Sequence, residues 1–209
     1  MPAFVEAVVK KLNAQGQLAE MGGQEASTML WALASMMGGG EGGSSGVRRG
    51  GLHPLVPPIC ERITSISTDM NATDLVNTLW GLATINQKYF LSSDSSSSNR
   101  AFTDAVSTAK ACLADKDLIK AFTAGQLALV LWSLGKLHNN ETKEIKLDEK
   151  ALSAKLISEL QHMHAQNIGM VAWGLGVARL RTGKKLVKAV IGRATELSTD
   201  MNWQTIAHV

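Results

Sequence analysis

Hydrophobic and polar residues recur in one phrase that surrounds four of the five tryptophans. The phrase is EASTMLWALASMM around Trp31, TDLVNTLWGLATI around Trp80, QLALVLWSLGKL around Trp132 and NIGMVAWGLGVARL around Trp173. With each Trp counted as position zero, apolar residues occupy positions −5, −1 and +2. At about 100° per residue these positions share one face of an α-helix. Each phrase therefore predicts an amphipathic helix, called here the Trp helix.

Another amphipathic segment precedes each Trp helix. Leu55, Val56, Ile59, Cys60, Ile63 and Ile66 follow one another at helical spacing, and Leu186, Val187, Val190, Ile191, Ala194 and Leu197 repeat the same offsets. Pro54, Pro57 and Pro58 suit the first turn of the earlier helix. Asn71, Thr123 and Asn202 are plausible N-caps nine residues before a Trp position, and Asp74 completes a near match to a capping box with Asn71.

The spacing of the tryptophans predicts a repeat near 38 residues. Consecutive Trp positions are 49, 52 and 41 residues apart, and the excess falls in Gly/Ser-rich or charged segments at 38–52, 92–99 and 139–148. The string STDMN occurs at 67–71 and again at 198–202. The second copy would place a further Trp two residues beyond Val209, so we expect the chain to be a fragment of a longer array.

These features predict an all-α protein, an α-solenoid of stacked antiparallel helix pairs forming a single array over 1–209. The expected repeats cover approximately 1–37, 53–91, 100–138 and 149–182, with an incomplete fifth repeat at 184–209.

The residues that flank the tryptophans predict where the indoles pack. Positions −4 and +3 are mostly small, as in Gly169 and Gly176. Small neighbours leave room for an indole or for the next helix. We therefore expect the four tryptophans to pack between neighbouring repeats: Trp31, Trp80, Trp132 and Trp173. The alternative is an indole that stacks on a nucleobase.

A third face of the Trp helix, at positions −7, −3, +1 and +4 with −6 at its edge, is a candidate binding surface. Position +1 is always Ala, Gly or Ser, so something can approach the backbone closely. Position −6 is polar in all five repeats. A fixed face with varying polar side chains suits a modular reader of single-stranded RNA, although a solvated groove or a protein-binding groove would look similar. The base-contact candidates are Glu25, Thr28, Asp74, Asn77, Gln126, Asn167, Thr205 and His208.

The charge distribution adds candidate phosphate contacts. The net charge is +3, and residues 160–195 contain no acidic side chain. A basic stretch of this kind fits a polyanionic partner, and it also fits a solvated helix end. The phosphate-contact candidates are Lys136, Arg179, Arg181, Lys184, Lys185 and Lys188.

The segment MNATDLVNTLWGLATI (70–85) resembles the octotricopeptide repeat family, which is related to the helical repeats of RAP-domain and FAST-kinase-like proteins. The resemblance implies an α-solenoid that binds RNA in mitochondria or chloroplasts and acts in transcript stability, processing, translation or ribosome assembly. Among the −3 positions, only Asn77 keeps the family's Asn. A scaffold that binds ribosomal or other organellar proteins in the same groove is the alternative.

Catalytic and cofactor motifs are not evident. GGGEGGSSG lacks the Gly-Lys-Ser/Thr of a phosphate loop, and no stretch is apolar enough to span a membrane. His162 and His164 point to different sides of a helix and have no completing metal ligands. Cys60 and Cys112 suit buried thiols in a reducing compartment. We expect a protein that is not an enzyme and that has no cofactor or metal.

Overall fold

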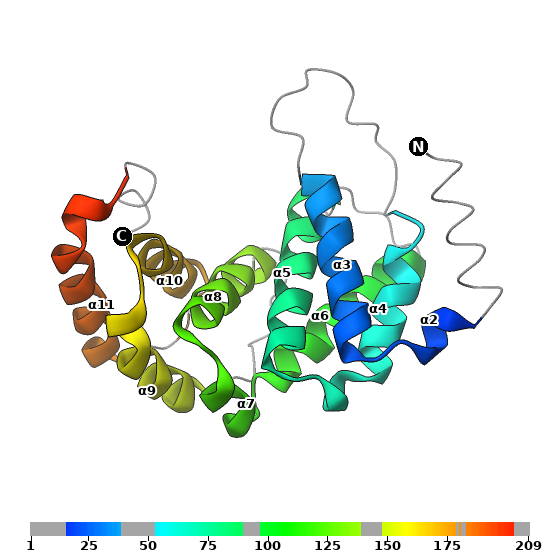
Figure 1. Ribbon diagram of the computed structural model, residues 1–209, viewed down its shortest axis with the longest axis horizontal. Coiled ribbons are helices and arrows are strands. Elements are labelled where there is room, and N and C mark those ends of the chain that lie inside the picture. The colour runs from blue at the N-terminus through cyan, green and yellow to red at the C-terminus, as the bar shows by residue number, and fades with distance from the viewer. Residues whose placement is uncertain are drawn as a thin grey trace, which may run out of the picture. The chain divides into compact units, whose positions relative to one another are not determined.

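The computed structural model describes residues 16–38, 53–89, 97–138, 148–178, 180 and 183–202. Within these residues every regular element is a helix, which confirms the all-α class. The chain divides into two compact units, Met1–Ala109 and Lys110–Val209 (Figure 1). Most of the three predicted insertions lies outside the described residues.

The first unit is built around two Trp helices that run side by side, α3 (Gly23–Gly38) and α5 (Ala72–Tyr89) (Figure 1). Helix α4 (Val56–Ser65) packs on α3 and on the short α2 (Gln17–Glu20). A 3-10 turn, η1 (Ser67–Asp69), leads from α4 to α5, and α6 (Ser97–Cys112) ends just inside the second unit.

The second unit repeats this arrangement with α8 (Ala124–His138) and α10 (Ala165–Val177) as its Trp helices. Helix α9 (Glu149–Glu159) and η2 (Leu160–His162) precede α10, while α11 (Lys184–Glu196) and η3 (Ser198–Asp200) follow it. Helix α11 packs on α9 and α10. The sequence did not predict the short α7 (Lys116–Ala121) that separates α6 from α8.

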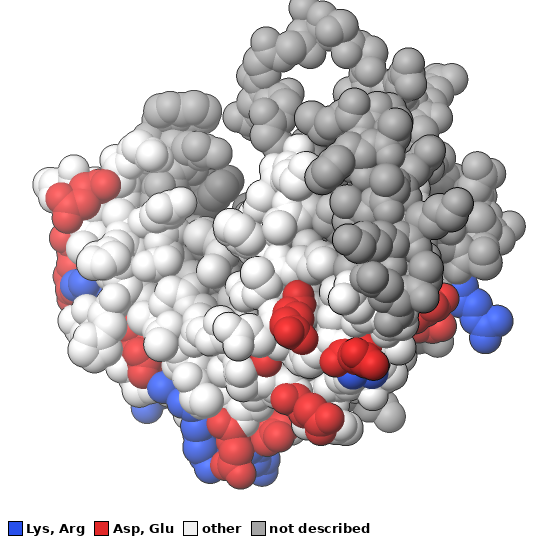
Figure 2. Space-filling model, turned by 45° about the vertical axis from the view of Figure 1, so that its right-hand side comes forward, with Lys and Arg blue, Asp and Glu red and all other residues white. Residues whose placement is uncertain are grey.

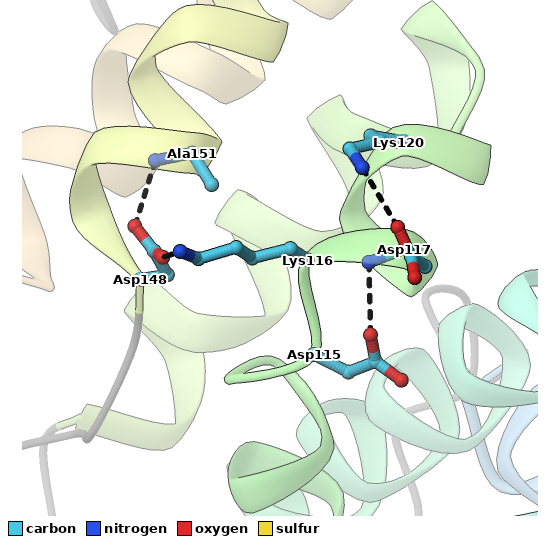
Figure 3. A network of polar contacts seen from close by, with 6 residues as sticks. All are labelled: Asp115, Lys116, Asp117, Lys120, Asp148 and Ala151. Atoms are coloured by element: carbon cyan, nitrogen blue, oxygen red, sulfur yellow. Dashed lines mark hydrogen bonds and ion pairs between the residues drawn. The ribbon is translucent and has the colours of Figure 1, made fainter.

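Helix α7 is capped and tied to α9 by charged side chains (Figure 3). The Asp115 carboxylate caps α7 by accepting from the backbone N–H of Asp117 at 2.8 Å. Lys116 Nζ reaches Asp148 at 3.4 Å, and Asp148 in turn accepts from the backbone N–H of Ala151 at the start of α9. The hydrogen bond from the Ala151 backbone N–H, together with the nearby Lys116 ammonium, lowers the pKa of the Asp148 carboxyl.

The same turn enters every Trp helix. One apolar residue in extended conformation comes just before the N-cap, with ψ between 129° and 136°: Met21, Met70, Phe122, Met163 and Met201. The first four of these side chains are buried. A single local geometry thus recurs at the entry of five predicted Trp helices, the last of which lies mostly outside the described residues.

The apolar stripe predicted for α4 is its buried face. Val56, Ile59, Cys60 and Ile63 are fully buried, with Leu55 and Ile66 nearly so. In α11 only part of the equivalent stripe is buried. Leu186, Val190 and Ala194 lie inside, whereas Val187 and Ile191 are 44% and 55% exposed. The stripe is thus buried along its whole length in α4 and only in part in α11, because no described element covers the second flank of α11.

The small residue at position +1 is where consecutive Trp helices touch. A Cβ on Gly81 would lie 3.0 Å from the Leu30 side chain, and a Cβ on Gly174 would fall on the backbone carbonyl of Leu131. In both units the glycine follows a Trp and meets the Leu that precedes the previous Trp. At these positions the partner that approaches the backbone is therefore the neighbouring helix.

Candidate nucleic-acid interface

The indoles of the first unit form a pair at the surface. The ring centroids of Trp31 and Trp80 are 5.9 Å apart and tilted by 36°, within the range of favourable aromatic contacts. Trp80 is half-buried, but Trp31 is 45% exposed. The ring contact joins two consecutive Trp helices, and Trp31 is more open to solvent than a residue wedged in a seam.

The indoles of the second unit are joined through a lysine. Lys136 Nζ lies 5.5 Å from the ring centroid of Trp132 and 4.9 Å from that of Trp173, which are cation–π distances. A Cβ on Gly135 would come within 2.6 Å of the Trp173 ring, so the small residue at +3 makes room for the indole of the next helix. The sequence did not reveal this role of Lys136, although i, i+4 spacing from Trp132 would have allowed the contact.

Position −6 caps its own helix in each of the four described Trp helices. Its side chain accepts from the backbone N–H at −9: Glu25 from Gly22 at 2.8 Å, Asp74 from Asn71 at 3.2 Å, Gln126 from Thr123 at 2.9 Å and Asn167 from His164 at 3.3 Å. The side chains of Asn71 and Thr123 in turn accept a hydrogen bond from the backbone N–H at −6, which confirms them as N-caps. Helix capping therefore accounts for the polar identity at −6, and base contact is not needed to explain it.

Asp74 is the most enclosed of these residues. It is 4% exposed, and its second carboxylate oxygen accepts from the buried hydroxyl of Ser27 on α3 at 3.3 Å. This carboxylate thus caps α5 and ties it to α3. The candidates Thr205 and His208 lie outside the described residues.

Position −3 differs between the two units. In the first unit it holds Thr28, which is exposed, and Asn77, which is half-buried, and neither side chain has a hydrogen-bond partner within the described residues. In the second unit it holds the half-buried, apolar Leu129 and Met170. Polar side chains at −3 without a partner in the described part of the chain are therefore found on the helices of Trp31 and Trp80.

The exposed cations predicted to contact phosphate lie on α11. Lys184, Lys185 and Lys188 are exposed, and within the described chain none has an ion-pair partner. Arg193 is committed elsewhere, to Glu196 at 2.8 Å and to two main-chain carbonyls at 3.3 Å. Arg179 and Arg181 lie outside the described residues. On the face drawn in Figure 2, basic side chains are mixed with acidic ones along the lower edge.

Other chemistry receives little support from the described residues. No three His, Cys, Asp or Glu side chains there gather to hold a metal, and none of the helices described is both long and apolar enough to cross a membrane. Burial raises the pKa of the Cys60 thiol to about 12, helped by neighbouring Glu61, so this thiol stays protonated at neutral pH.

Comparison with known proteins assigns this chain to no family. No known family model matches this chain, and no curated protein shows a significant sequence match.

Replacement of Asp74 and Asn77 separates the capping role from a binding role. Asp74→Ala is expected to lower the free energy of unfolding by about 1–3 kcal/mol, because it removes a helix cap and the hydrogen bond from Ser27 that ties α5 to α3. Asn77→Ala is expected to stay within ~0.5 kcal/mol of the parent, since its amide makes no bond inside the described structure. Urea denaturation of both variants measures the difference, and equal losses would contradict these assignments.

Proposed function

We propose that this chain is part of an α-solenoid that binds single-stranded RNA along the exposed face of its Trp helices. The observation that carries the proposal is the surface shared by α3 and α5, where the exposed Trp31 ring packs on the half-buried Trp80 ring. The same two helices carry Thr28 and Asn77, whose side chains have no hydrogen-bond partner among the described residues. The recurrent entry turn and the glycine contact between Trp helices, present in both units, support a solenoid built from repeats.

This surface has the chemistry that single strands require. Unpaired bases are recognised by stacking on aromatic rings and by hydrogen bonds to their edges. The Trp31–Trp80 pair supplies the ring, and a hydroxyl and an amide at −3 supply donors and acceptors. In the second unit, considered by itself, the exposed Lys184, Lys185 and Lys188 of α11 supply positive charge for backbone phosphates.

The biological setting follows from the resemblance to octotricopeptide repeats. We propose a role in organellar RNA metabolism in a mitochondrion or chloroplast, which includes transcript stability, processing, translation or ribosome assembly. In this proposal the protein acts by binding and performs no chemistry itself.

One observation favours a protein-interaction scaffold as a second candidate. Trp31 and Met36, both on α3, are 45% and 68% exposed, and exposed apolar side chains are found on surfaces that bind proteins. A ribosomal or other organellar protein would then occupy the Trp-helix face in place of RNA.

A filter-binding titration tests the proposed function. Single-stranded RNA and a duplex of the same sequence are titrated against the protein at two salt concentrations. We expect the single strand to bind more tightly and its affinity to fall as salt rises. Absence of binding to any single-stranded sequence in a randomised pool would contradict the proposal and leave the scaffold as the better account.

A further inference from the structure

We infer that the Trp31 indole is a stacking platform for a nucleobase whose edge is held by Thr28 or Asn77, an inference that rests on the proposed RNA-binding function. Trp31 is the most exposed tryptophan in the described chain, with 45% of its surface accessible. The ring of Trp80, 5.9 Å away, supports it from the neighbouring helix. An indole held by a second indole offers its accessible surface without first having to be ordered.

In the second unit the chain itself supplies a contact to the two indoles. There the residue at +4 is Lys136, and its ammonium lies over both rings. In the first unit the residue at +4 from Trp31 is Ser35, whose hydroxyl donates to the Trp31 carbonyl at 2.9 Å. No cation covers the Trp31 ring in the part of the chain that the structure describes. Lys136 thus covers the rings of the second unit, whereas no described cation covers the Trp31 ring of the first.

The neighbouring polar groups favour a nucleobase over a cationic side chain. Thr28 precedes Trp31 by three residues and Asn77 precedes Trp80 by three, so each shares a helix face with its indole. Their side chains have no partner among the described residues and can pair with ring nitrogens and carbonyl oxygens of a base.

A cationic ligand would bind best beside a carboxylate that makes no other hydrogen bond. The carboxylates in the first turns of α3 and α5 already accept hydrogen bonds from the protein. Glu25 accepts from the backbone N–H of Gly22, and Asp74 is buried against Ser27 and Asn71. At position −3 of α3 and α5 the first unit therefore presents neutral hydrogen-bonding groups beside a π surface, a combination that matches a base.

Substitution of Trp31 tests the inference. Trp31→Leu is expected to weaken binding to single-stranded RNA roughly tenfold or more, the usual loss when one stacked base is given up, and Trp31→Phe should lose less. Met36→Leu is the matched control, because Met36 is also an exposed apolar residue of α3 and should leave affinity unchanged. Thermal unfolding of each variant establishes that the helices still pack.

Fluorescence gives a second readout that a structural role would not change. RNA is expected to quench the tryptophan emission of the parent more than that of Trp31→Phe, because a stacked base quenches the indole directly. Equal affinity and equal quenching in Trp31→Leu, with RNA still bound, would overturn the inference while the proposed function stands. Failure of the parent to bind RNA would overturn both. Quenching by a lysine-rich peptide and not by RNA would identify a cation site and also overturn the inference.

Discussion

Gly174→Ala is expected to lower the free energy of unfolding by about 2–3 kcal/mol, even though alanine is the better helix former. The new methyl group would fall on the backbone carbonyl of Leu131, so α8 and α10 would have to separate. A backbone atom cannot move aside as the end of a side chain can, and Leu131→Ala should therefore not rescue the variant. Urea denaturation, monitored by circular dichroism, measures the loss.

Gly176→Ala is the matched control on the same helix. Gly176 is exposed and has nothing within 4 Å of an added Cβ. This substitution is expected to raise stability by roughly 0.5–1 kcal/mol through helix propensity alone. Similar effects at the two glycines would show that α8 and α10 are not in the close contact described.

The triple variant Lys184→Gln, Lys185→Gln and Lys188→Gln is expected to weaken single-stranded RNA binding on the order of 30–100-fold at ~0.1 M salt. Each cation that neutralises a phosphate releases counterions, at a slope of ~0.7 per contact. The slope of log affinity against log salt should therefore flatten by about 2. Titrations of the parent and the variant over a salt series measure both effects, which should be similar for all RNA sequences because phosphates carry no base identity.

A second triple variant with the same change in net charge separates specific contact from overall charge. Lys116, Lys120 and Lys155 are already paired with Asp148, Asp117 and Glu159. Replacing these three with Gln should change RNA affinity much less than replacing the α11 lysines. If the two triple variants bind alike, the α11 lysines do not form a phosphate-binding surface.

The helices that carry periodic patterns were predictable because local chemistry decides them. The apolar stripe of α4 and the N-caps Asn71 and Thr123 appear where the sequence predicted them. The repeated entry turn was also within reach, since an apolar residue precedes each N-cap in the sequence. The turn does not show in the hydrophobic pattern, because a single apolar residue between helices carries no periodicity.

The interface was harder to predict because its pattern has more than one physical cause. A polar residue at −6 suits base contact and capping equally well in sequence, and only the hydrogen bonds to position −9 distinguish them. A small residue at +1 indicates close approach without naming the partner, which proved to be Leu30 for Gly81 and Leu131 for Gly174. Helix α7 is too short for a periodic signal, although Asp115 is a recognisable cap.

Photo-cross-linking tests the central claim most directly, namely that RNA bases lie on the exposed face of the Trp helices. Single-stranded RNA carrying 4-thiouridine is irradiated with the protein, and the linked residues are identified by mass spectrometry. We predict links within residues 28–35 of α3 and at or next to Asn77 of α5, which Trp31→Leu should reduce. Links confined to α4, α6 and α9 would contradict the account.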